Sequence, residues 1–121
     1  MRKINKLIIV LFILLNFVNY SLAENNFFEK GKNKYDEEKY DEAKFLFQRS
    51  IVFNPKDKDS YLYLAKIYNF EENKKEEQKN IDTVLLLDPK NEEANLILME
   101  IELKRSNYSK VKELADNFSK I

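Results

Sequence analysis

The sequence predicts an all-α fold, an α-α superhelix of about three helix–turn–helix repeats. Two prolines, Pro55 and Pro89, lie 34 residues apart, and each follows an Asn or Asp residue. A period of this length is typical of stacked helical hairpins. Between the prolines, apolar residues recur at spacings of three and four, which is the period of a helix, and no segment shows the alternation of a strand. We therefore expect six helices in three units of residues 24–57, 58–91 and 92–121.

The first 23 residues are predicted to lie outside this domain, as a signal peptide. Three basic residues precede an apolar run, residues 7–18, and the small residues Ser21 and Ala23 follow it. This is the layout of a secretory signal peptide and predicts cleavage after Ala23. The run is shorter than the roughly 20 residues that a membrane-spanning helix needs. The alternative is an uncleaved anchor over residues 4–22.

Helix boundaries within the repeats follow from capping residues and breaks. Asn54 precedes a proline, which disfavours a helical backbone, so a helix should end there. Asp57 or Asp59 can cap the next helix. A capping box from Asn73 to Glu76, within the charged run 71–80, should open the fourth helix. The expected inward faces, one for each of the last five helices, are Tyr40, Ala43, Phe47, Ser50 and Ile51; Tyr61, Leu64, Ala65 and Tyr68; Ile81, Val84, Leu85 and Leu87; Leu98, Ile101 and Leu103; and Val111, Leu114, Ala115 and Phe118.

Aromatic, small and proline residues recur in one order through the units. The matching residues are Phe27, Gly31, Ala43, Phe47, Ser50 and Pro55; then Tyr61, Leu64, Ala65, Tyr68, Ile81 and Pro89; then Leu98, Tyr108, Val111 and Ala115. This order resembles the tetratricopeptide repeat over the whole chain after the leader. The sequence departs from that pattern at Lys30, Lys34, Lys74, Glu77 and Met99. Because Glu77 replaces a small residue, we expect residues 71–80 to be the most mobile bend.

Composition argues against catalysis and nucleic-acid binding. The chain has 21 basic and 21 acidic residues, and three of the basic residues lie in the leader, so the body is weakly acidic. Such a body has no electrostatic attraction for nucleic acid. There is no His and no Cys, which removes the commonest general base, the thiol nucleophile and nearly all zinc sites. The paired acids, such as those at 76–77, are read as solvated. We expect no enzyme, no cofactor, no metal site and no small-molecule substrate.

The resemblance implies a protein- or peptide-binding groove lined by the first helix of each unit. The corresponding residues here are Phe28, Lys32, Tyr35, Leu62, Tyr63, Lys66, Asn69, Phe70, Leu96, Ile97 and Glu100. Some members of the family grip a C-terminal carboxylate with Lys, Asn and Arg. Phe28, Lys32, Tyr63, Glu93 and Ile97 occupy those positions here, so that clamp is absent. What remains is an apolar and aromatic groove, although half of these residues could equally belong to the core.

The sequence thus favours a non-catalytic adaptor in the cell envelope. Its Lys-, Asn- and Ile-rich composition is typical of an AT-rich bacterial genome, so we expect a periplasmic or secreted protein. The alternative is a membrane-tethered or self-associating structural module with an uncleaved anchor, in contact with the membrane only through its leader. The last helix has a polar outer face and can cap the array. Phe118 and Ile121 at its end leave homodimerisation open.

Overall fold

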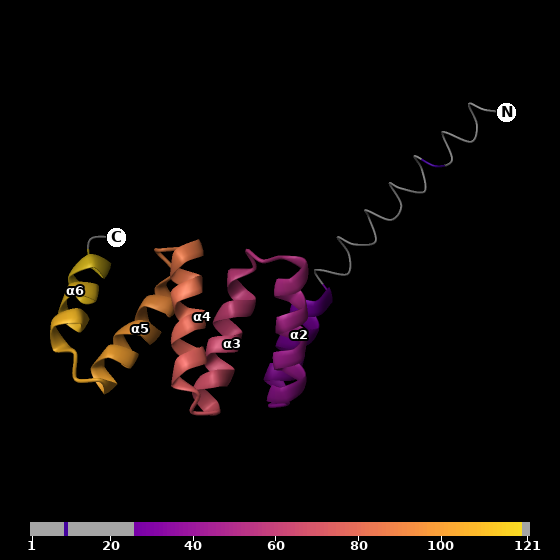
Figure 1. Cartoon of the computed structure of the whole chain (residues 1–121), viewed down its shortest axis with the longest axis horizontal. Coiled ribbons are helices and arrows are strands. Elements are labelled where there is room, and N and C mark those ends of the chain that lie inside the picture. The colour runs from indigo at the N-terminus through magenta and orange to yellow at the C-terminus, as the bar shows by residue number, and fades with distance from the viewer. Residues whose placement is uncertain (1–8, 10–25, 120–121) are drawn as a thin grey trace. The chain divides into compact units, whose positions relative to one another are not determined.

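The computed structural model describes residue 9 and residues 26–119. The predicted cleavage site at Ala23 therefore lies outside the described residues. Residues 26–119 contain six helices and no strand, which confirms the all-α prediction. The helices cover residues 26–36, α2 (Tyr40–Phe53), α3 (Lys58–Phe70), α4 (Lys74–Leu87), α5 (Glu92–Lys104) and α6 (Tyr108–Phe118) (Figure 1). The chain divides into two compact units, one ending at Asn54 and the other beginning at Pro55.

The three hairpins turn through one backbone conformation. Glu38, Glu72 and Ser106, at intervals of 34 residues, have φ angles of 60°, 56° and 59°. Each is the left-handed residue that follows the first helix of its hairpin. The periodicity that the prolines indicate is therefore also present in the backbone dihedral angles.

The hydrogen bonds of these turns repeat as well. In the second hairpin the Glu72 N–H donates to Asn69 O, and the Asn73 N–H donates to Tyr68 O. The first and third hairpins form the same two bonds at positions 34 residues away. This is the Schellman arrangement, which satisfies carbonyls that the end of a helix would otherwise leave unpaired.

Gly31 sets the distance between the two helices of the first hairpin. A Cβ atom at this position would lie 2.8 Å from the Phe47 ring. Phe47, Ala43 and Ser50 are all buried on the facing side of α2. The ring thus occupies the space that a side chain at Gly31 would need, so the glycine lets the two helices approach closely.

We predict that Gly31→Ala destabilises the protein. Overpacking a core costs about 1 to 3 kcal/mol, and the better helix propensity of Ala returns about 1 kcal/mol, so the net loss should be about 1 kcal/mol. Chemical denaturation of this variant and of Lys32→Ala, an exposed neighbour on the same helix, measures it. The lysine variant should match the wild type. A Gly31→Ala protein as stable as the wild type would contradict the role of Gly31.

The second unit has a core formed by three helices. Its buried cluster joins α3, α4 and α5, and Tyr61, Leu85, Ile97 and Leu98 pack against it. The cluster consists of Leu62, Ala65, Ile81, Val84, Ala94 and Ile101. Leu62 was not among the expected core positions of its helix, and neither was Ile67, which is also fully buried. The buried face of α3 is therefore wider than the sequence pattern predicts.

Asx side chains cap three helices of this unit. The Asp57 Oδ1 accepts from the Ser60 N–H at 3.2 Å, and the Asn73 Oδ1 accepts from the Glu76 N–H at 3.3 Å. Both caps confirm predictions from sequence. Asn91 caps α5 in the same way, accepting from the Ala94 N–H at 2.9 Å. Of the charged run 71–80, only residues 71–73 lie outside a helix, so the bend is shorter than expected.

An ion pair joins the start of α3 to the residue that ends α4. The Lys58 Nζ donates to the Asp88 carboxylate at 2.5 Å. This hydrogen bond lowers the pKa of Asp88 and raises that of Lys58. Asp88 also precedes the second repeat proline, so the pair ties the two ends of the second hairpin together.

The third hairpin is packed more loosely than the sequence predicts. Leu103, expected on the inward face of α5, is 53% exposed, and no residue of α6 is buried. Val111, Leu114 and Phe118 are half-buried, and Ala115 is exposed. The apolar stripe of α6 thus exists as expected, but it is only partly covered.

Candidate partner-binding surface

The expected groove residues of the first unit are mostly engaged with the hairpin itself. Phe28 is half-buried, and its ring lies 5.9 Å from that of Phe47. Tyr35 packs edge-on against Tyr40, with ring centroids 5.4 Å apart. Lys32 is exposed. Phe28 and Tyr35 are therefore part of the packing of this hairpin, and Lys32 is the more accessible side chain.

Leu62 is a correction to the predicted groove. It is only 6% exposed and belongs to the buried cluster of the second unit. Ile97 is partly buried and packs against the same cluster. The resemblance to the repeat family placed both residues on the binding face, but which side chains are buried depends on the helices that pack against α3 and α5.

The Asn69 side chain bonds a buried residue of its own hairpin and does not line a groove. Its Nδ2 donates to the Glu77 Oε1 at 2.6 Å. Glu77 is 2% exposed, which corrects the expectation that this carboxylate is solvated. A buried carboxylate is stable only with hydrogen-bond donors or an opposite charge nearby. The departure of Glu77 from the repeat pattern is therefore compensated by Asn69.

We predict that Asn69→Leu destabilises the protein by about 2 kcal/mol, because Glu77 is then buried without this donor. Adding Glu77→Ala, which restores a small residue at this position, should recover more than half of the loss. Thermal or chemical unfolding of the single and double variants measures the coupling. In the same background, Glu76→Ala should recover nothing. If Asn69→Leu matched the wild type, the pairing would have no energetic role.

Lys66 lies between an aromatic ring and a carboxylate. Its Nζ lies 4.8 Å from the centre of the Tyr63 ring and 2.6 Å from the Glu93 Oε1. Glu93 belongs to α5. It stands at one of the positions that form the C-terminal carboxylate clamp in some members of the repeat family. The pair therefore brings the faces of α3 and α5 together through opposite charges.

The accessible surface of this unit forms two stripes. Tyr63, Lys66 and Phe70 follow one side of α3 at spacings of three and four, and Phe70 is 59% exposed. On α5, Leu96 is 55% exposed, and Glu100 accepts from the Lys104 Nζ at 2.7 Å, which raises the pKa of Lys104. We call this surface the α3–α5 face. Its residues are Tyr63, Lys66, Phe70, Glu93, Leu96 and Glu100.

The second unit also contains a cavity of about 230 Å³ beside the turns of its hairpins. It is lined by Lys74, Glu77, Ile101, Lys104 and Arg105. Two of its charged side chains form ion pairs with neighbouring carboxylates. Arg105 donates to the buried Glu102 at 3.1 Å, and Lys104 forms a salt bridge with Glu100. Two of the cations that line the cavity are thus paired with carboxylates.

Among residue 9 and residues 26–119, no group of three or more His, Cys, Asp or Glu side chains is placed to hold a metal ion. Within the same residues, no helix has the length and apolar character needed to span a membrane.

The fold of this protein is that of the tetratricopeptide-like helical repeats. The TPR domain of Arabidopsis OM64 superposes with a TM-score of 0.69 at 18% sequence identity, over 79% of each chain. A chain of the CopN–Scc3 complex superposes with a TM-score of 0.66 at 12% identity, over 77% of this chain and 55% of that chain. No family model matches the sequence, and no curated protein does either. These likenesses establish the fold.

Proposed function

We propose that this protein is a non-catalytic adaptor of the cell envelope, which binds a protein or peptide through the first helices of its repeats. The α3–α5 face carries this proposal. It exposes Phe70 and Leu96 beside a charged pair that is already neutralised. Exposed apolar side chains rimmed by polar groups are typical of protein–protein interaction sites. The presence of a similar fold in the CopN–Scc3 complex supports a protein partner.

The chemistry of this face indicates the kind of partner it suits. An extended or helical peptide can place apolar anchors against Phe70 and Leu96. Glu93 and Glu100 border the face, and each is paired with a lysine of the same unit. The face therefore offers little net charge, and recognition should depend on apolar complementarity more than on charge.

We predict that Leu96→Asp weakens partner binding by about tenfold, a typical effect for an apolar anchor at an interface. The tagged full chain is used as bait in envelope extract, and the captured proteins are quantified. Leu86→Asp is the matched control because Leu86 is a leucine of α4 that is 82% exposed. It should retain the partner. Identical capture by the wild type and both variants would contradict binding through the α3–α5 face.

The envelope location rests on the leader, residues 1–23. We predict that the protein isolated from its native source begins at Glu24, because Ser21 and Ala23 form a small-residue cleavage site. Intact-mass spectrometry distinguishes this form from the uncleaved chain. An N-terminus at Met1 would instead favour the membrane-tethered alternative.

A further inference from the structure

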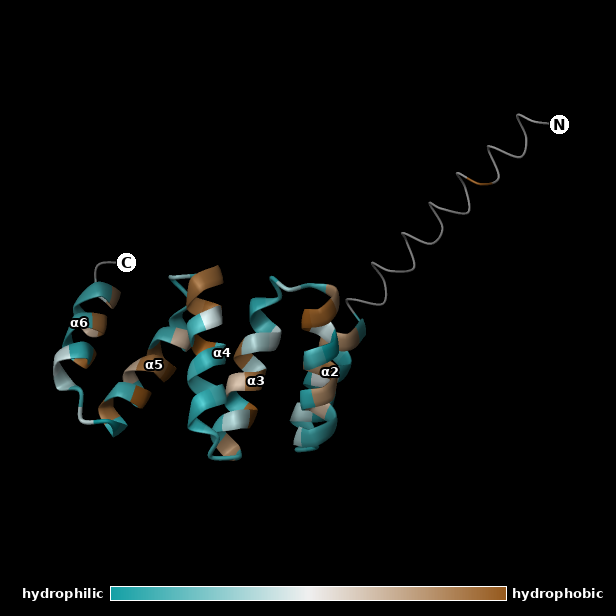
Figure 2. Ribbon diagram, viewed as in Figure 1, coloured by the Kyte–Doolittle hydropathy of each residue, from teal (hydrophilic) through white to brown (hydrophobic). Residues whose placement is uncertain are grey.

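Helix α6 repeats the positions that are buried in α4, but none of its own residues is buried. The buried residues of α4 are Glu77, Asn80, Ile81 and Val84. The residues one repeat later, which we call the α6 stripe, are Val111, Leu114, Ala115 and Phe118. Three of them are half-buried, and Ala115 is exposed. In Figure 2, hydrophobic residues, in brown, lie among the hydrophilic residues of α6.

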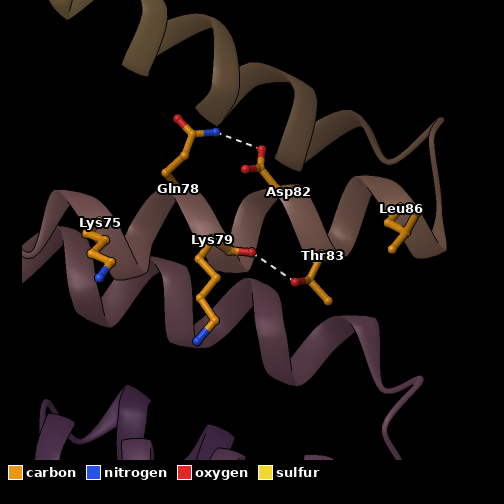
Figure 3. Close-up of a pocket in the computed structure, with 6 residues that line it drawn as sticks. All are labelled: Lys75, Gln78, Lys79, Asp82, Thr83 and Leu86. Carbon is orange, nitrogen blue, oxygen red and sulfur yellow. Dashed lines mark hydrogen bonds between the residues drawn. The ribbon is translucent and has the colours of Figure 1, made fainter.

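The polar positions of the two helices correspond as well. Figure 3 shows the polar side chains of α4, which are Lys75, Gln78, Lys79, Asp82 and Thr83. Two hydrogen bonds lie along this side of the helix: Gln78 donates to Asp82 at 2.7 Å, and Thr83 Oγ1 donates to Lys79 O at 2.9 Å. The equivalent residues of α6 are Ser109, Lys112, Glu113, Asp116 and Asn117. The two helices therefore share one phase, and the α6 stripe stands where α4 is covered.

The second unit shows what covers this side of α4. Ile81 and Val84 belong to a buried cluster that also contains residues of α5. The α5 residues in or against that cluster are Ala94, Ile97, Leu98 and Ile101. They follow one another at spacings of three, one and three, which places them on one side of the helix. The repeat thus covers this position with a helix that has an apolar stripe of that spacing.

The α6 stripe has the same spacing as the covering stripe of α5. Val111, Leu114, Ala115 and Phe118 stand at i, i+3, i+4 and i+7, as Ala94, Ile97, Leu98 and Ile101 do. Helix α6 therefore combines the position of a covered helix with the pattern of a covering one. The distance at which two helices pack depends on the side chains at their contact. The small exposed Ala115 allows a second helix to approach closely.

The first helix of another copy does not have the residues to cover the α6 stripe. Two repeats before the covering residues of α5 lie Asn26, Glu29, Lys30 and Asn33. All four are polar and exposed. A head-to-tail contact between copies, which would continue into a filament, is therefore disfavoured. An isologous contact, in which the same surface of both copies meets, is the arrangement that remains for two chains of this sequence.

The charges of α6 favour an antiparallel pair. Lys112 and Asp116 are exposed and lie one turn apart on the same flank of the helix. A two-fold axis level with Leu114 brings this flank of both helices together and sets Lys112 of each copy beside Asp116 of the other. The helix dipoles are then also opposed, which is the favourable direction. A parallel pair would instead place like charges at the same level.

We propose that the α6 stripe packs on the α6 stripe of a second copy, in an antiparallel pair with two-fold symmetry. The contact buries the apolar side chains that the third hairpin leaves partly exposed. This inference goes beyond the proposed adaptor function and does not depend on it. The pair would present two α3–α5 faces, so a partner with two binding segments would gain from avidity.

The test uses disulfide formation in the full chain, which has no native cysteine. Ala115→Cys reports on the stripe, and Ser109→Cys, on the polar side of α6, is the matched control. Each chain is oxidised in an extract of its source cells, and cross-linked products are separated without reductant and identified by mass spectrometry. We expect about tenfold more covalent dimer from Ala115→Cys, because only residues near the axis reach disulfide geometry.

A charge exchange tests the orientation. In the Ala115→Cys chain, Asp116→Lys should lower the dimer yield about fivefold, because it replaces two opposite-charge contacts with like-charge ones. Adding Lys112→Asp should restore the yield. All substituted positions are exposed, so every variant should keep the wild-type circular dichroism spectrum.

Four results would overturn the proposal. Equal yields from Ala115→Cys and Ser109→Cys would indicate random collision, and no dimer from Ala115→Cys would exclude the contact. A cross-link from position 115 to a different protein would assign the stripe to that protein. A mixed product from co-expressed Lys30→Cys and Ala115→Cys chains would indicate head-to-tail packing.

Discussion

The left-handed residue that closes each hairpin is the constraint on which the rest of the structure depends. Glu38, Glu72 and Ser106 adopt a conformation that costs a non-glycine residue about 1 kcal/mol or more, and the Schellman hydrogen bonds offset that cost. Because the turn is the same each time, the second helix always begins in the same phase. The fifth residue after the turn then points into the hairpin: Ala43 in the first and Glu77 in the second. Glu77 is thus buried by the geometry of the backbone, and Asn69 supplies the hydrogen bond that makes its burial tolerable.

Local signals were sufficient to predict much of this fold from sequence. The breaks at Pro55 and Pro89 and the caps at Asp57 and Asn73 all depend on residues near one another in a repeat. The candidate surface was predicted less well. Leu62 is core, Asn69 faces Glu77, and Lys66 is paired with Glu93. Each outcome depends on which side chain from another helix lies opposite, and no spacing within one helix contains that information. A buried Glu at a small-residue position was the one signal that could have indicated a compensating partner.

The α3–α5 face lies on the first helices of the repeats, where the charges are neutralised in pairs and the exposed side chains are apolar.

The most direct test of the central claim, that one hairpin geometry is repeated three times, is an NMR measurement of the backbone φ angle from scalar couplings and chemical shifts. Positive φ at Glu38, Glu72 and Ser106, flanked by negative values in the adjoining helices, is the predicted result. A negative φ at any of the three would mean that its hairpin turns differently. The repeat phase, and with it the inward position of Glu77 and the assignment of the α3–α5 face, would then be wrong.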